Sequence, residues 1–181
     1  MRLKEGWHAM SSPEVTSRPA RRFMDLVGEC AAHVQEIMPW DLVERLEANP
    51  PLLLDIREPY EFDAMHVAGS LNVPRGILET ACEYGYEETV PRLAAARERE
   101  IVLICRSGNR SILAAWVMQQ MGYRNVYSLK TGLRGWNDFE QPLVNHAGEP
   151  VDLEDADAYF TPRLRPEQLA PQRAVREATA D

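Results

Sequence analysis

The chain has 181 residues, 45% of them hydrophobic and 27% charged, which suffices for one substantial core but not for two ordinary domains. Lys and Arg number 20 against 28 Asp and Glu, and the net charge of -8 argues against a domain that binds nucleic acid through its phosphates. No run approaches the roughly 18 apolar residues of a membrane span, and the first ten residues lack the apolar core of a signal peptide, so we expect a soluble, cytoplasmic protein.

The N-terminal residues divide into two parts. Residues 1–20 are polar and interrupted by Ser and Pro, which predicts an irregular arm. Between residues 21 and 33, apolar side chains recur at three- and four-residue steps. This spacing predicts an accessory amphipathic helix that docks on the domain.

Residues 34–146 alternate short apolar runs with helical patterns, which predicts a single α/β domain. Strands are expected at 34–37, 52–56, 70–73, 101–104 and 125–129. The second and fourth runs are apolar on both faces, as central parallel strands are. Helices are expected at 40–48, at about 91–99 and at 110–121, the last of them largely buried. Residues 147–181 are acidic and broken by prolines, and we expect them to form a tail without a core of its own.

The turn after the fourth run carries the strongest chemical signal. Cys105 ends a buried strand, and a buried helix begins near Arg110. Ligands of α/β sheets bind beyond the carboxyl ends of the strands, where the amides and dipole of a helix start favour an anion. Together with the charges of Arg106 and Arg110, this position stabilises a thiolate, so we expect Cys105 to be a nucleophile.

The rest of this turn suits the same purpose. Gly108 permits a positive φ or a close approach of amides, Ser107 and Ser111 offer hydroxyl donors, and Asn109 completes the turn. Its short length predicts that the backbone amides converge on one small group.

Two further residues are expected at the same edge of the sheet. Asp55 lies near the end of the central run at 52–56, and Arg57 directly follows that run. Their side chains should therefore lie beside the pocket. Arg57 either contacts the substrate or pairs structurally with Asp55 or Glu58. His66 precedes a strand, and we interpret it as a structural hydrogen-bonding residue, with a general base as the alternative.

The remaining thiols carry no comparable signal. Cys30 and Cys82 are not flanked by a cluster of basic residues, and we interpret them as ordinary small apolar residues. Cys30 and His33 could form half of a metal site, but no second pair accompanies them. We therefore expect neither a metal nor an organic cofactor.

Three segments closely resemble single-domain rhodaneses in order and spacing: LLLDIREPYEF at 52–62, HVAGSLNVP at 66–74 and CRSGNRS at 105–111. Gly132 and Trp136 also match, and the resemblance covers roughly residues 34–144. There are departures from the pattern, all of them outside the Cys105 loop. Met65 and Ala68 replace a frequent Gly and Pro, while Thr131 and Glu140 stand where glycines are common.

The resemblance implies a three-layer α/β/α fold with a five-stranded parallel sheet. It implies that Cys105 carries a persulfide, that the following loop is its amide cradle, and that Asp55 and Arg57 support the pocket. The expected activity is a thiosulfate sulfurtransferase, which moves a sulfane sulfur from a small anion to cyanide, a thiol or a protein thiol. Loop amides and Arg110 would stabilise the persulfide anion.

Several alternatives remain open. A rhodanese-fold module that binds a partner or relays sulfur without turnover is one. A cysteine phosphatase or arsenate reductase is another, although related loops of that kind have five residues between Cys and Arg, and Cys105 and Arg110 are separated by four. A homodimer is compatible with the sequence.

Overall fold

The computed structural model describes residues 20–170. The arm expected at 1–20 lies outside this range except for its last residue, as does the end of the expected tail. Within the described residues, no helix has both the length and the apolar character needed to cross a membrane.

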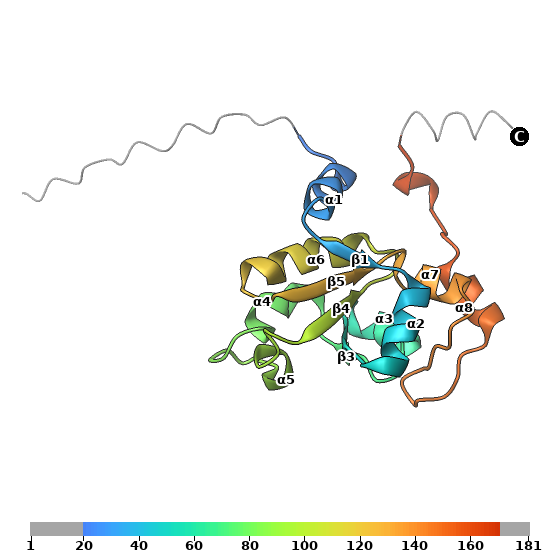
Figure 1. Cartoon of the computed structure of the whole chain (residues 1–181). Coiled ribbons are helices and arrows are strands. Elements are labelled where there is room, and N and C mark those ends of the chain that lie inside the picture. The colour runs from blue at the N-terminus through green and yellow to red at the C-terminus, as the bar shows by residue number, and fades with distance from the viewer. Residues whose placement is uncertain (1–19, 171–181) are drawn as a thin grey trace, which may run out of the picture.

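Five strands form one fully parallel sheet, as the resemblance implied (Figure 1). The strands are β1 (Gln35–Ile37), β2 (Leu52–Asp55), β3 (Leu71–Asn72), β4 (Glu100–Ile104) and β5 (Asn125–Leu129), in the order β1-β5-β4-β2-β3. All four residues of β2 are buried, as are the last four of β4. These two strands are neighbours at the centre of the sheet, which explains why their sequences lack a polar alternation.

Helices cover both faces of the sheet, so the fold has three layers. The helices are α1 (Phe23–Ala31), α2 (Pro39–Ala48), α3 (Pro59–Ala64), α4 (Leu78–Ala81), α5 (Pro91–Ala94), α6 (Asn109–Gln120), α7 (Gly132–Asp138) and α8 (Leu153–Phe160), with short 3-10 turns η1 (Arg75–Ile77) and η2 (Pro166–Gln168). Side chains of α4, α5 and α6 pack on one face of the sheet. Side chains of α2, α7 and α8 pack on the other face.

The strand order creates a switch point between β2 and β4. The chain leaves β2 toward β3 on one side, and leaves β4 toward β5 on the other. At such a point the following loops diverge and leave a crevice beyond the carboxyl ends of the strands. Asp55 ends β2 and Cys105 follows β4, so the topology places both residues at this crevice.

Part of the expected tail belongs to the domain, which corrects the sequence analysis. Residues 153–160 form α8, and its Ala156 and Phe160 are buried in the core that α2 and α7 share. The prolines and the acidic charge of this segment hid the helix from the sequence analysis. Only these two side chains are fully buried, so the apolar pattern of the helix is weak. The helix expected at 91–99 is also shorter than predicted, since α5 ends at Ala94.

Two positions where single-domain rhodaneses commonly have glycine keep a glycine-like backbone. Thr131 has φ 64° and Glu140 has φ 53°, the only non-glycine residues with positive φ in the described range. This left-handed conformation is costly for a residue with a Cβ, and more so for β-branched Thr131. At both positions a residue with a Cβ therefore adopts a backbone conformation that glycine takes up more easily.

Candidate active site

The sulfur of Cys105 lies where the N-terminus of α6 would hold an anion. Sγ accepts hydrogen bonds from the backbone N–H of Gly108 at 3.2 Å and of Ser111 at 3.4 Å. The Ser111 hydroxyl lies 3.3 Å from the same sulfur. These N–H groups have no partner within the first turn of the helix, so they are free to serve the sulfur.

Cys105 itself is fully buried. Around it, the side chains of Arg106, Ser107, Asn109 and Arg110 are half-exposed. A donor molecule therefore has to pass between side chains of the loop to reach Sγ. The sulfur of the other buried thiol, Cys82, accepts no hydrogen bond from a backbone amide among the contacts of residues 20–170, and burial raises its pKa.

Two glycines make the tight loop possible. Gly108 has φ +87°, and a Cβ there would lie 3.0 Å from the backbone nitrogen of Thr131. Gly132, at the start of α7, packs against the loop from behind, and its Cβ would lie 2.4 Å from the Cys105 carbonyl oxygen. The next two amides, of Leu133 and Arg134, donate to the carbonyls of Cys105 and Arg106. Hence α7 fixes the backbone on which the thiol sits.

Arg110 is held by a carboxylate that the sequence analysis did not single out. Its Nη1 and Nη2 donate to Oε2 and Oε1 of Glu61 at 2.8 and 2.9 Å. These hydrogen bonds raise the pKa of Arg110 above its usual value. Burial raises the pKa of Glu61, but the hydrogen bond and charge of Arg110 outweigh burial and leave it lowered. Both groups are therefore charged near neutral pH.

Asp55 and Arg57 form a buried pair at the same edge. The Arg57 guanidinium donates to both carboxylate oxygens of Asp55, and also to the carbonyls of Glu61 and Met65. Both residues are fully buried. Of the two interpretations of Arg57, the structure favours the structural pair with Asp55, because most of its N–H groups already have partners.

The side chain of Arg106 points to α8. Its Nη2 donates to the carbonyl oxygens of Tyr159 and Phe160 at 3.1 and 3.0 Å, and the guanidinium lies 5.5 Å from the centre of each ring. These carbonyls are at the negative end of the α8 dipole, where a cation is favourable. On the other side of the loop, the Asn109 amide lies 3.7 Å from the sulfur of Met24 in α1. The helices α1 and α8 thus both contact the Cys105 loop.

His66 does not join this group. Its Nδ1 lies 2.9 Å from the carbonyl oxygen of Phe62, its ring stacks on Phe62, and its backbone pairs with Val144. Ser107 has no side-chain hydrogen bond among the described contacts, whereas Ser111 bonds to the Gly108 carbonyl and to the Ser128 hydroxyl, at 2.9 and 2.7 Å. Of the two expected serines, Ser111 is the one that contacts Sγ.

Sequence reasoning missed three groups at the site. Glu61 could have been suspected, because Pro59 marks a helix start that places it in the first turn. Ser128 is a buried polar residue between Tyr127 and Leu129 in β5. Tyr159 gave no signal, because its approach depends on how α8 docks. Among residues 20–170, no cluster of three or more His, Cys, Asp or Glu is arranged to hold a metal ion.

A parallel α/β sheet with a buried thiol after a central strand, facing two backbone amides, defines a class of α/β proteins with a cysteine loop at the switch point. Within this class the chain belongs to the rhodanese family, since the model of the rhodanese-like domain matches residues 38–139. The matched residues begin after α1 and end before α8.

Similar proteins include sulfur-handling ones. YrkF of Bacillus subtilis (strain 168), named as a candidate sulfur carrier protein, is 28% identical over 138 residues, covering 74% of this chain and 69% of its own. A candidate mitochondrial thiosulfate sulfurtransferase of Schizosaccharomyces pombe is 32% identical over 90 residues, covering 48% and 63%. The solved structure of RPA3614 from Rhodopseudomonas palustris, described as a candidate tyrosine phosphatase of unknown function, has a TM-score of 0.60 at 25% identity, covering 73% of this chain and 98% of that one.

Proposed function

We propose that the protein is a sulfurtransferase that carries a sulfane sulfur on Cys105. The observation that carries the proposal is the convergence of the Gly108 and Ser111 amides on Sγ. Neutral N–H donors that face a sulfur stabilise its anionic form, which is both the nucleophile and the leaving group of persulfide chemistry. The relatives named for sulfur transfer or sulfur carriage support the same proposal.

The reaction proceeds in two steps. In the first, the Cys105 thiolate attacks the outer sulfur of thiosulfate, the S–S bond of thiosulfate breaks, and sulfite leaves with the bonding electrons. In the second, a thiophile attacks the outer sulfur of the persulfide, and the Cys105 thiolate leaves. No general base is required in either step once the thiol is ionised, and the mechanism predicts ping-pong kinetics.

The residues around Cys105 have distinct roles in this mechanism. The Gly108 and Ser111 amides hold the anionic sulfur, and the Ser111 hydroxyl donates to it when its single proton turns from the Gly108 carbonyl to Sγ. Arg110 provides a fixed positive charge beside the loop, and Glu61 fixes its position. The Asp55–Arg57 pair links the end of β2 to α3 and to the segment after α3. These elements form the side of the site that carries Glu61. His66 supports the same segment from outside the site.

Phosphate hydrolysis is a second candidate, because one structural neighbour is described as a candidate phosphatase. It is less favoured here, because only four residues separate Cys105 from Arg110 and Sγ itself occupies the ring of amides. A small ring suits one additional sulfur better than a tetrahedral phosphate. The carboxylates of Glu61 and Asp55 are also engaged, by Arg110 and Arg57, rather than available as a general acid.

Steady-state kinetics with thiosulfate and cyanide test the proposal. Parallel double-reciprocal lines are expected, with thiocyanate and sulfite formed in equal amounts. Cys105→Ala should abolish turnover, and Cys82→Ala, which changes a buried thiol outside the site, should retain it. An aryl phosphatase activity that depends on Cys105, with no thiocyanate formed, would contradict the proposal.

A further inference from the structure

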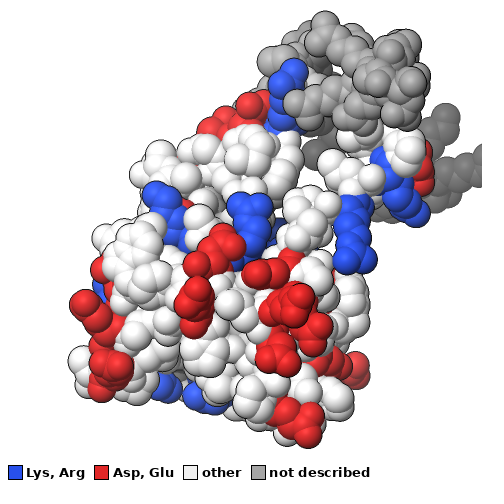
Figure 2. Space-filling view, turned by 90° about the vertical axis from the view of Figure 1, so that its right-hand side faces the viewer, with Lys and Arg blue, Asp and Glu red and all other residues white. Residues whose placement is uncertain are grey.

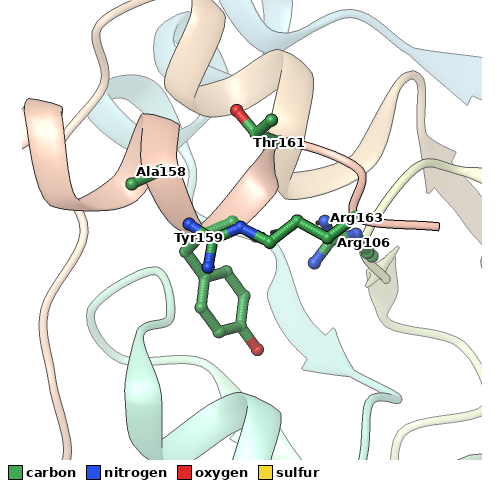
Figure 3. Close-up of a pocket in the computed structure, with 5 residues that line it drawn as sticks. All are labelled: Arg106, Ala158, Tyr159, Thr161 and Arg163. Carbon is green, nitrogen blue, oxygen red and sulfur yellow. Dashed lines mark hydrogen bonds between the residues drawn. The ribbon is translucent and has the colours of Figure 1, made fainter. Parts of the chain in front are cut away.

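A hollow with basic walls lies between the Cys105 loop and the end of α8. It is lined by Arg106, Ala158, Tyr159, Thr161 and Arg163 and has a volume of 460 Å³. In Figure 3 the side chains of Arg106, Tyr159 and Arg163 gather around the same space. We refer to these five residues as the α8 hollow. Four of the five residues lie after residue 139, where the match to the family model ends.

The α8 hollow is physically joined to the catalytic loop. Arg106 directly follows Cys105 and donates to the last carbonyls of α8. Tyr159 is half-buried at the end of α8, and besides burial the charges of Arg57, Glu61 and Arg106 act on its hydroxyl. A molecule in the hollow therefore lies next to the loop that holds the reactive sulfur.

The walls offer hydrogen-bond donors. Arg163 is exposed and makes no ion pair or side-chain hydrogen bond with the described part of the chain. Burial raises the pKa of Tyr159, so its hydroxyl remains protonated and able to donate. Figure 2 shows that basic side chains form a row across the face that carries α8, while acidic side chains gather below them. A positive site within a chain of net charge -8 selects anions locally.

We propose that the α8 hollow binds the carboxylate of a small thiol that accepts the sulfur from Cys105. This inference rests on the proposed sulfurtransferase function and names the acceptor class. A guanidinium presents paired donors that match the two oxygens of a carboxylate. In the proposed mechanism thiosulfate already has the loop amides and the charge of Arg110 at Sγ. We therefore assign the second basic site to the acceptor.

The transfer step balances without another reactant. The thiol group of the acceptor loses its proton to solvent, and its sulfur attacks the outer sulfur of the Cys105 persulfide. The S–S bond of the persulfide breaks, and its electron pair remains on Cys105 as the thiolate. The acceptor leaves as a persulfide that keeps its carboxylate.

Three thiols that differ in charge test the inference: 3-mercaptopropionate, neutral 2-mercaptoethanol and cationic cysteamine. Full-length protein is first loaded with sulfur from thiosulfate, and the loss of that sulfur to each thiol is followed by intact mass. The measured quantity is the rate ratio of 3-mercaptopropionate to 2-mercaptoethanol. Because the mutant ratio is divided by the wild-type ratio, the intrinsic reactivity of each thiol cancels.

Arg163→Gln should lower this ratio about fivefold, as expected for loss of one charge-assisted hydrogen bond at a partly exposed site. The ratio of cysteamine to 2-mercaptoethanol should rise, because a repelling charge is removed. Arg165→Gln is the matched control: Arg165 is an exposed arginine two residues further on, pairs with Glu167 and does not line the hollow. It should leave both ratios unchanged.

The inference is overturned if Arg163→Gln slows all three thiols equally, or if Arg165→Gln lowers the ratio as much as Arg163→Gln does. Failure of the underlying function has a different signature, since wild-type protein would then take up no sulfur on Cys105 at all. If sulfur is loaded onto Cys105 but Arg163→Gln leaves the rate ratio of 3-mercaptopropionate to 2-mercaptoethanol unchanged, only the acceptor site is rejected.

Discussion

Arg110 and Glu61 form a two-point ion pair across the entrance to the Cys105 loop, with N–O distances of 2.8 and 2.9 Å. The pair joins the first turn of α6 to the first turn of α3. The pair holds the positive charge of Arg110 in one position beside the sulfur. Both ends of the guanidinium are bonded to Glu61, so it is not free to bind an anion from solvent. Its two members are 49 residues apart in the chain, so the pair also closes the fold around the site.

Glu61→Gln should reduce stability in a pH-dependent way. The pKa of Glu61 is lowered in the folded protein, so its stabilisation is present above the ordinary value of 4.5 and is lost as the pH falls through the folded pKa. We expect the variant to lose about 1 kcal/mol at pH 7, a modest figure because the Arg110 side chain is partly exposed to solvent. Urea unfolding at pH 7 and pH 4 measures the difference, which should shrink at the lower pH. An equal loss at both values would contradict this account of the pair.

Ser111→Ala should slow persulfide formation, because it removes the hydroxyl 3.3 Å from Sγ. We expect a decrease of about tenfold, since the two amides remain in place. Ser128→Ala is the matched control: it removes the bonded hydroxyl partner of Ser111 but no donor to the sulfur. Both variants should lose about 1 to 2 kcal/mol of stability. Stopped-flow measurement of sulfite release separates them, and equal rates in the two variants would refute a direct role for Ser111.

Gly132→Ala should destabilise the protein by about 3 kcal/mol or more, because the added Cβ meets backbone and the residue has a positive φ. The closest atom would be the Cys105 carbonyl oxygen, at 2.4 Å. Gly122→Ala is the control for the backbone conformation alone, since Gly122 has φ +89° and open space around it. It should cost about 1 kcal/mol. If Gly132→Ala and Gly122→Ala lower the free energy of unfolding in urea by similar amounts, close packing of α7 on the Cys105 loop is unimportant for stability.

Arg57→Met should cost about 3 to 5 kcal/mol, because it leaves the carboxylate of Asp55 buried without its partner. Adding Asp55→Leu should recover much of the loss, since the unpaired charge is then removed. Thermal unfolding of the two single variants and the double variant gives the coupling. If the double variant is less stable than Arg57→Met alone, the pair does not behave as a buried ion pair.

The sequence predicted the strands well, because they depend on local patterns, and it placed the turn after Cys105 between a buried strand and a buried helix, as the structure does. The apolar runs that became β2 and β4 had no other explanation than central strands, and Gly108 between Cys105 and a buried helix indicated a cradle. The partners of these residues were harder to predict. Glu61 reaches Arg110 only through the packing of α3 against α6, and Tyr159 reaches Arg106 only because two side chains of α8 are buried. Such contacts depend on tertiary docking rather than on periodicity.

The most direct test of the central claim is the mass of the intact protein after incubation with thiosulfate. We predict a gain of one sulfur, which peptide mapping assigns to Cys105 and which is lost on addition of cyanide. Cys105→Ala should gain nothing, whereas Cys30→Ala and Cys82→Ala should gain as much as wild type. Sulfur found on Cys30 or Cys82, or no gain in the wild-type protein, would contradict the account.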